Sequence, residues 1–183
     1  MHLIQLPSYP VPLCVSAWVL VAASIDLVSR RIPNWLVGSG LLAALAVQLW
    51  LHGVAAGGTA WLAGAAVGFA AFLPFYLLRG MAAGDVKLMM MVGAWLGASI
   101  ACYIVLATFI AGGIGSALLA VFRGHLARLL RNVRAMAFGT LSQLTHRGTP
   151  APSGRAGAES IGSIPYGVAI AAGTLGVLCV MAG

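Results

Sequence analysis

The acidic residues of this chain are its strongest candidates for a chemical role, because an apolar chain keeps so few of them. Only three of the 183 residues are Asp or Glu, namely Asp26, Asp85 and Glu159. Two carboxyl groups that share one proton can activate a water molecule for attack on a peptide carbonyl. Such a pair titrates as one unit and is best treated as a dyad. Asp26 and Asp85 are candidates for this chemistry, provided that the elements around them bring them together.

The composition indicates what kind of protein must hold these carboxyl groups. Hydrophobic residues make up 61% of the chain and charged residues 7%, whereas an ordinary soluble domain has roughly 25% charged residues. So few charges cannot cover a soluble surface, and a disordered chain would be poor in apolar side chains. We therefore expect an all-α integral membrane protein. Its net charge of +7 comes from only ten Lys and Arg, too few for a groove that follows phosphates, so no nucleic-acid partner is expected.

Five apolar stretches predict the membrane-spanning helices. They are residues 11–28, 35–51, 59–78, 88–122 and 166–182. As one helix, residues 88–122 would be ~52 Å long, against a hydrocarbon core of ~30 Å. We therefore expect this stretch to turn near residues 97–99 and to form two helices. The prediction is a polytopic protein of six transmembrane helices, with residues 1–183 as a single membrane-embedded domain.

The basic residues support this count independently. All ten fall between the first and second, third and fourth, or fifth and sixth predicted spans: Arg30, Arg31, Arg79, Lys87, Arg123, Arg128, Arg131, Arg134, Arg147 and Arg155. Positively charged loops stay in the cytoplasm, so we expect both termini to lie outside. The same topology places Asp26 and Asp85 together at the cytoplasmic boundary of the membrane.

The longest basic loop, residues 123–163, is expected to have two parts. Its first part has apolar residues at helical spacing with Arg128, Arg131 and Arg134 between them. This pattern predicts a basic amphipathic helix on the cytoplasmic surface, in contact with anionic lipids. Its second part is rich in Gly, Pro, Ser and Ala and is typical of a flexible linker, in which Glu159 is expected to be solvated.

Each aspartate also has a purely structural explanation, which remains open at this point. Asp26 could pair with Arg30, four residues later on a continuing helix. Asp85 could be the N-cap of a helix that begins at Val86. The corresponding alternative function is a non-enzymatic assembly or carrier subunit of a secretion or pilus system. A proton-coupled carrier usually has its acids near the bilayer midplane, so two acids at one boundary favour an enzyme.

Three short motifs resemble the type IV prepilin peptidases, a family of GxGD aspartic membrane peptidases. Residues 80–88 of this chain, GMAAGDVKL, resemble the family's GxGD segment. Residues 26–34, DLVSRRIPN, resemble the family's first aspartate and the basic-Ile-Pro-Asn turn that follows it. The start of the family's last helix resembles residues 164–167, IPYG. The motifs follow one another in the family's order and span most of the chain. In length the chain is similar to the short members associated with tight-adherence pilus systems.

The resemblance implies an aspartic endopeptidase of the bacterial inner membrane, with Asp26 and Asp85 as catalytic residues. Its substrates would be type IV (Flp-type) prepilins and pseudopilins, whose basic leader peptide precedes a hydrophobic helix and is removed at the cytoplasmic face. The cytoplasmic cysteine-bearing domain of the longer, methylating members is missing, so we do not expect methyltransferase activity. Neither a metal nor a cofactor is implied, and the cysteines Cys14, Cys102 and Cys179 are too far apart to suggest a metal site.

Four further residues are expected to shape the site. We expect Gly84 to let the chain turn sharply beside the dyad, and Lys87 to extend toward the lipid headgroups. Pro33 and Asn34 form a helix-start signal for the second span. Ala82 stands where the family has the first glycine of GxGD, which is a mild change if the backbone φ there is negative.

Overall fold

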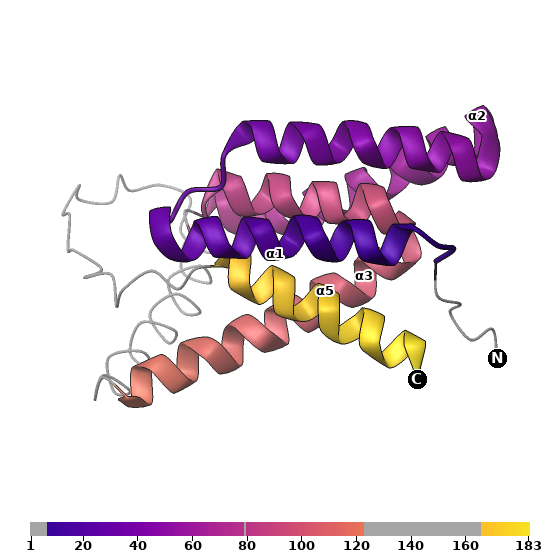
Figure 1. The fold of residues 1–183 in the computed structure, drawn as a ribbon. Coiled ribbons are helices and arrows are strands. Elements are labelled where there is room, and N and C mark those ends of the chain that lie inside the picture. Colours follow the sequence, from indigo (N-terminus) through magenta and orange to yellow (C-terminus); the bar gives the residue numbers. More distant parts are fainter. Residues whose placement is uncertain (1–6, 79, 123–165) are drawn as a thin grey trace, which may run out of the picture. The chain divides into compact units, whose positions relative to one another are not determined.

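The computed structural model describes residues 7–78, 80–122 and 166–183, and every regular element within these ranges is a helix. The helices are α1 (Val11–Ser29), α2 (Asn34–Leu77), α3 (Ala83–Phe122) and α5 (Tyr166–Ala182) (Figure 1). The all-α class is therefore confirmed for this part of the chain. The expected amphipathic helix and linker of residues 123–163, including Glu159, lie outside the described residues.

The helices are as apolar as the composition requires. Three of them, α1, α2 and the Ala83–Leu118 part of α3, are long and apolar enough to cross a membrane. Helix α5 is also apolar but has only 17 residues. These findings support a membrane protein, whereas the number of spans and the side on which the termini lie stay predictions.

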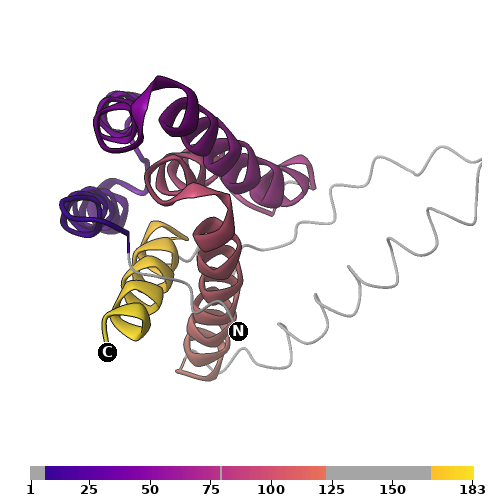
Figure 2. The same cartoon turned by 90° about the vertical axis from the view of Figure 1, so that its right-hand side faces the viewer.

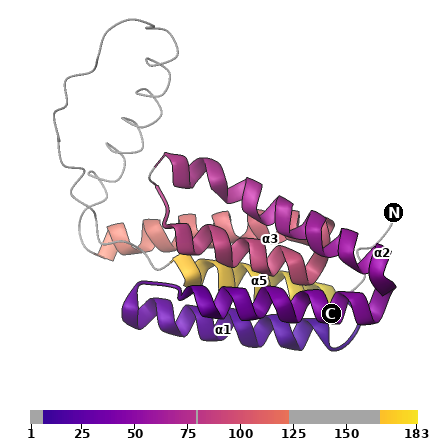
Figure 3. The ribbon, with the colours of Figure 1, turned by 90° about the horizontal axis from the view of Figure 1, so that it is seen from above.

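Helices α2 and α3 are each interrupted by one glycine. With 44 and 40 residues, unbroken helices would be ~66 and ~60 Å long. Gly53 (φ 77°) and Gly97 (φ 79°) adopt left-handed conformations, which cost glycine nothing. At each break the chain reverses direction (Figure 3). The turn expected near residues 97–99 is thus confirmed at Gly97, and the second and third predicted spans meet at Gly53.

Close backbone contact between α2 and α3 depends on glycines. A Cβ added at Gly64 would collide with the backbone of Gly93, and one added at Gly68 would collide with the backbone of Met89. Small residues spaced four apart allow this approach in membrane helices. This contact covers one side of the first half of α3. Figure 2 shows that half surrounded by α1, α2 and α5. Its fully buried apolar side chains are Leu88, Met89, Met91, Val92, Ala94 and Trp95.

The chain divides into two compact units, and one of them holds every residue of the candidate site. This unit contains α1, α2, α3 as far as Gly112, and α5. Within it, α1 packs against α5 and against α2. The described part of the second unit is the remainder of α3, from Gly113 to Phe122.

Candidate functional site

Asp26 lies in the last turn of α1, which ends at Ser29. Arg30 adopts a left-handed conformation (φ 51°), and its N–H donates a hydrogen bond of 2.9 Å to the carbonyl of Asp26, a common way of ending a helix. The Asp26 side chain is 6% exposed. Its Oδ2 accepts a hydrogen bond of 2.9 Å from the backbone N–H of Gly167. The helix on which Asp26 was expected to pair with Arg30 stops at Ser29, and the pairing of the two side chains stays a prediction.

Asp85 lies in the first turn of α3 and is not the residue that precedes the helix. The helix begins at Ala83, so the N-cap interpretation of Asp85 is wrong. Its side chain is 5% exposed, and its Oδ2 accepts a hydrogen bond of 3.3 Å from the N–H of Ala82. The Asp85 N–H in turn donates to the Ala82 carbonyl at 3.1 Å. A side chain at the third helical position that reaches back to the N-cap N–H is one half of a capping box.

The structure brings Asp26 and Asp85 within electrostatic reach of each other. The two carboxyl groups come from different helices and lie close enough for their charges to interact. Burying two such groups is costly unless each is hydrogen-bonded, and a backbone N–H supplies a bond to each of them. Two buried carboxyl groups within electrostatic reach favour a state in which they share one proton. The arrangement has the chemical capacity of an acid–base pair.

Gly84 serves a different purpose from the one expected. It lies in the first turn of α3, and the left-handed conformations found in the described chain are those of Arg30, Gly53 and Gly97. Gly84 therefore does not make a sharp turn. A Cβ built on it would lie 3.2 Å from the Cβ of Ile32, so the glycine makes room for the turn that follows α1. The same finding removes a left-handed requirement at Ala82.

Asn34 and Lys87 form a second link between the two motifs. Pro33 is the N-cap of α2 and its carbonyl accepts a hydrogen bond of 3.2 Å from the N–H of Leu36, so the predicted helix start is confirmed. The Asn34 side chain does not cap the helix and instead accepts a hydrogen bond of 3.0 Å from Lys87 Nζ. Lys87 is exposed. Its ammonium group donates to Asn34, a contact that was not expected in addition to the predicted contact with lipid headgroups.

The first turn of α5 also belongs to the site, although the sequence did not predict this. Gly167 is the hydrogen-bond partner of Asp26, and the charge of Asp85 acts on the neighbouring Tyr166. Both residues belong to the IPYG motif at residues 164–167. That motif was the available signal, although nothing in its residue types indicates which side chain it meets.

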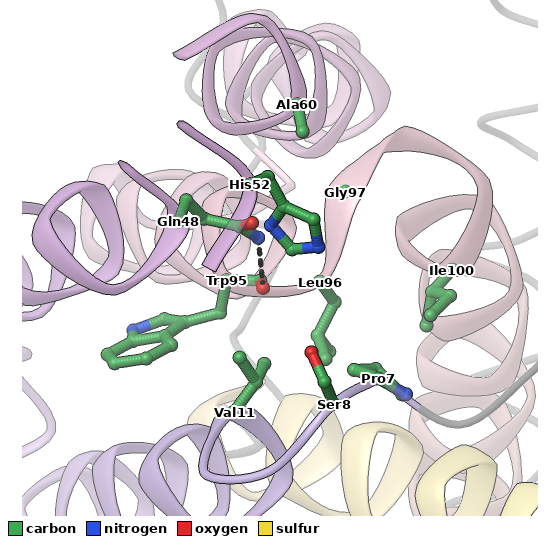
Figure 4. Close-up of a pocket in the computed structure, with 10 residues that line it drawn as sticks. All are labelled: Pro7, Ser8, Val11, Gln48, His52, Ala60, Trp95, Leu96, Gly97 and Ile100. Atoms are coloured by element: carbon green, nitrogen blue, oxygen red, sulfur yellow. Dashed lines mark hydrogen bonds between the residues drawn. The ribbon is translucent and has the colours of Figure 1, made fainter. Parts of the chain in front are cut away.

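A hollow of about 200 Å³ lies near the break at Gly97, where Gln48, Trp95 and Gly97 contribute to its lining (Figure 4). None of its lining residues is acidic. Gln48 Nε2 donates a hydrogen bond of 2.8 Å to the Trp95 carbonyl, beside the point at which the break interrupts the helical hydrogen bonds. We interpret Gln48 as a stabiliser of this helix end, and the hollow offers no second pair of carboxyl groups.

Comparison with known families agrees with the motifs and the geometry. Residues 13–117 match the type IV leader peptidase family. The matched range includes both aspartates and Gly84, covers more than half of the 183 residues, and ends before α5. Comparison with curated proteins and with solved structures gives no match. The resemblance stated from three short motifs is confirmed: the chain belongs to the type IV leader peptidase family.

Proposed function

We propose that this protein is an aspartic endopeptidase that removes the basic leader peptide from type IV (Flp-type) prepilins and pseudopilins. Membership of the leader peptidase family supports the reaction class. One observation carries the assignment of Asp26 and Asp85 as the catalytic pair. Asp26 and Asp85 are both buried, and the charge of Asp26 acts on Asp85.

The proposed reaction needs one proton shared by the two carboxyl groups. The ionised carboxylate takes a proton from a water molecule, whose oxygen attacks the carbonyl carbon of the scissile peptide bond. The protonated partner gives its proton to the carbonyl oxygen, which yields a neutral tetrahedral diol. The first group then protonates the leaving nitrogen as the C–N bond breaks, and the second takes back a proton from a diol hydroxyl. The pair ends with one shared proton, as it began.

Backbone hydrogen bonds orient the carboxyl groups of Asp26 and Asp85 for this reaction. The N–H groups of Gly167 and Ala82 each bond to Oδ2 of one carboxyl group. Backbone donors in helix termini have little freedom to move, so they fix the orientation of both acids before substrate binds. Orientation of reacting groups in advance is a major source of catalytic rate.

We propose that the site faces the cytoplasm at the inner membrane of a bacterium. Asp26 is four residues from Arg30 and Asp85 is two residues from Lys87 in the sequence, and positive loops remain cytoplasmic. The proposed substrate has a leader followed by a hydrophobic helix, so its scissile bond would lie at the boundary of the membrane. Anionic lipids and the negative charge of the pair would both attract a basic leader.

Co-expression with a precursor tests this proposal against a non-enzymatic assembly or carrier subunit. The full chain is produced together with an Flp-type precursor in a host that has no prepilin peptidase, and the precursor and mature forms are separated by immunoblot. We expect wild type and the control Glu159→Gln to process the precursor, and Asp26→Asn and Asp85→Asn to leave it uncut. Normal processing by either aspartate variant would show that the aspartates are not the catalytic pair, and an uncut precursor in cells with the wild-type chain would favour the non-enzymatic alternative.

A further inference from the structure

The first turn of α5 meets the candidate pair from a part of the chain outside the residues matched by the leader peptidase family. The Gly167 N–H lies in that turn, where a helix has no internal acceptor for its first N–H groups. It donates instead to Asp26 Oδ2 at 2.9 Å, across 141 residues of sequence. The contact is buried, so water does not readily replace it.

The absence of a side chain at Gly167 is what permits this contact. A Cβ at that position would lie 2.8 Å from Asp26 Oδ2 and 3.0 Å from Asp26 Cβ. Both distances are well below ordinary van der Waals contact. Either Asp26 or the first turn of α5 would have to shift to relieve the overlap, which would lengthen or break the hydrogen bond. The position therefore requires glycine because of Asp26 and not because of a left-handed backbone.

The residue before Gly167 lies within electrostatic reach of the other member of the pair. Tyr166 is partly buried and packs against the apolar core, and Asp85 acts on it electrostatically. One helical turn thus contacts Asp26 of α1 and lies within electrostatic reach of Asp85 of α3. A displacement of this turn would move Asp26 relative to Asp85.

We propose that Gly167 is a positioning residue of the peptidase, whose N–H holds the Asp26 carboxyl group in the orientation that it needs to act with Asp85. The assignment rests on the proposed function of the aspartate pair. Gly167 does not react with substrate in this proposal. Its contribution is made through Asp26, so its loss should reduce turnover and leave substrate affinity unchanged.

Steady-state kinetics on the purified full chain in detergent test this assignment, with an Flp-type precursor peptide as substrate. Gly167→Ala is compared with Gly176→Ala on the same helix, where an added Cβ meets nothing within 4 Å. We expect Gly167→Ala to lower kcat by about 100-fold with KM within about 3-fold of wild type, since small misplacements of catalytic groups cost on this order. Gly176→Ala should stay within about 2-fold in both constants.

A second variant tests the hydrogen bond without adding any atoms. Replacing the amide N–H of Gly167 by an ester oxygen removes the donor and adds no side chain, so we expect the fold to be kept even if Gly167→Ala does not accumulate. We expect kcat to fall by about 10-fold or more, again with KM unchanged. Wild-type kcat in the ester variant, or in folded Gly167→Ala, would overturn the proposal.

Asp26→Asn, measured in the same series, identifies which claim has failed. If Asp26→Asn is inactive while the Gly167 variants cleave at the wild-type rate, the positioning role is wrong and the aspartate pair stands. If Asp26→Asn cleaves at the wild-type rate, the catalytic pair is wrong and the positioning role falls with it.

Discussion

Ile32 packs directly against Gly84, with a separation of 3.2 Å between the Ile32 Cβ and a Cβ placed on the glycine. Ile32 belongs to the turn that follows Asp26, and Gly84 immediately precedes Asp85. The contact therefore joins the two short motifs that carry the aspartates. It explains why the second motif needs a residue without a side chain, although its backbone is that of an ordinary helix.

Enlarging Gly84 should separate the two motifs. Gly84→Val places branched carbons against Ile32, and overpacking of this kind costs about 1–3 kcal/mol. We expect the cleavage rate to fall at least about 10-fold, because a small displacement of a catalytic group lowers the rate by this order or more. Gly38→Val is the matched control on α2, because a Cβ at Gly38 meets nothing within 4 Å. Equal activity of the two variants in a cleavage assay would show that the Ile32 contact does not position Asp85.

Placing a glycine at residue 82, which would complete the GxGD pattern that this segment resembles, should change little. Ala82 is outside the left-handed region, and its N–H already bonds to Asp85. We expect Ala82→Gly to keep cleavage within about 2-fold and to leave the free energy of unfolding unchanged or raised by a few tenths of a kcal/mol, since glycine is the better N-cap. Ala82→Pro removes the N–H, and its cleavage rate should fall at least about 10-fold. A large gain with glycine, or full activity with proline, would contradict this account.

The link between Lys87 and Asn34 should be weak, because both side chains are exposed. Exposed contacts of this kind contribute about 1 kcal/mol or less. We expect Lys87→Met, Asn34→Ala and the double variant to cleave precursor within about 5-fold of wild type, with a coupling energy below about 1 kcal/mol in a double-mutant cycle of unfolding. A loss of cleavage comparable to that of an aspartate variant would instead place Lys87 in the catalytic machinery.

Gln48 should affect stability without affecting catalysis. Gln48→Leu leaves the buried Trp95 carbonyl without the donor that now lies 2.8 Å away, and such a loss costs about 1–3 kcal/mol. The affected end of the helix is separated from Asp85 by ~15 Å along α3. Thermal unfolding in detergent should therefore show a lower midpoint, while kcat at a temperature where the protein stays folded should equal that of wild type. A reduced kcat in folded protein would show that the break at Gly97 influences the site.

Local patterns predicted much of the fold and the two central site residues. The apolar stretches anticipated the helices, and the length of residues 88–122 anticipated the reversal at Gly97, because a helix of that length exceeds the thickness of a membrane. The scarcity of acids in an apolar chain indicated Asp26 and Asp85 as candidate site residues. The Pro33–Asn34 pair correctly predicted where α2 begins.

Local sequence patterns could not predict contacts between segments that are far apart in the chain. The start of α3 was placed too late because Ala82 and Ala83 carry no capping side chain, so Asp85 was the first visible signal of a helix start. Gly84 was misread because a glycine required for close contact has the same appearance in a sequence as one required for a turn. Gly167 was missed since its partner lies 141 residues away, and helix pairing decides such contacts.

Cleavage kinetics of Asp26→Asn, Asp85→Asn and the double variant test the central claim most directly. The purified full chain is mixed with a precursor peptide, and the new N-terminus is identified and quantified by mass spectrometry. Members of one catalytic unit are strongly non-additive, so we predict that each single variant loses at least about 1,000-fold in kcat and that the double variant loses no more than either single variant. A single variant that retains wild-type kcat, or losses that multiply in the double variant, would contradict a shared catalytic pair.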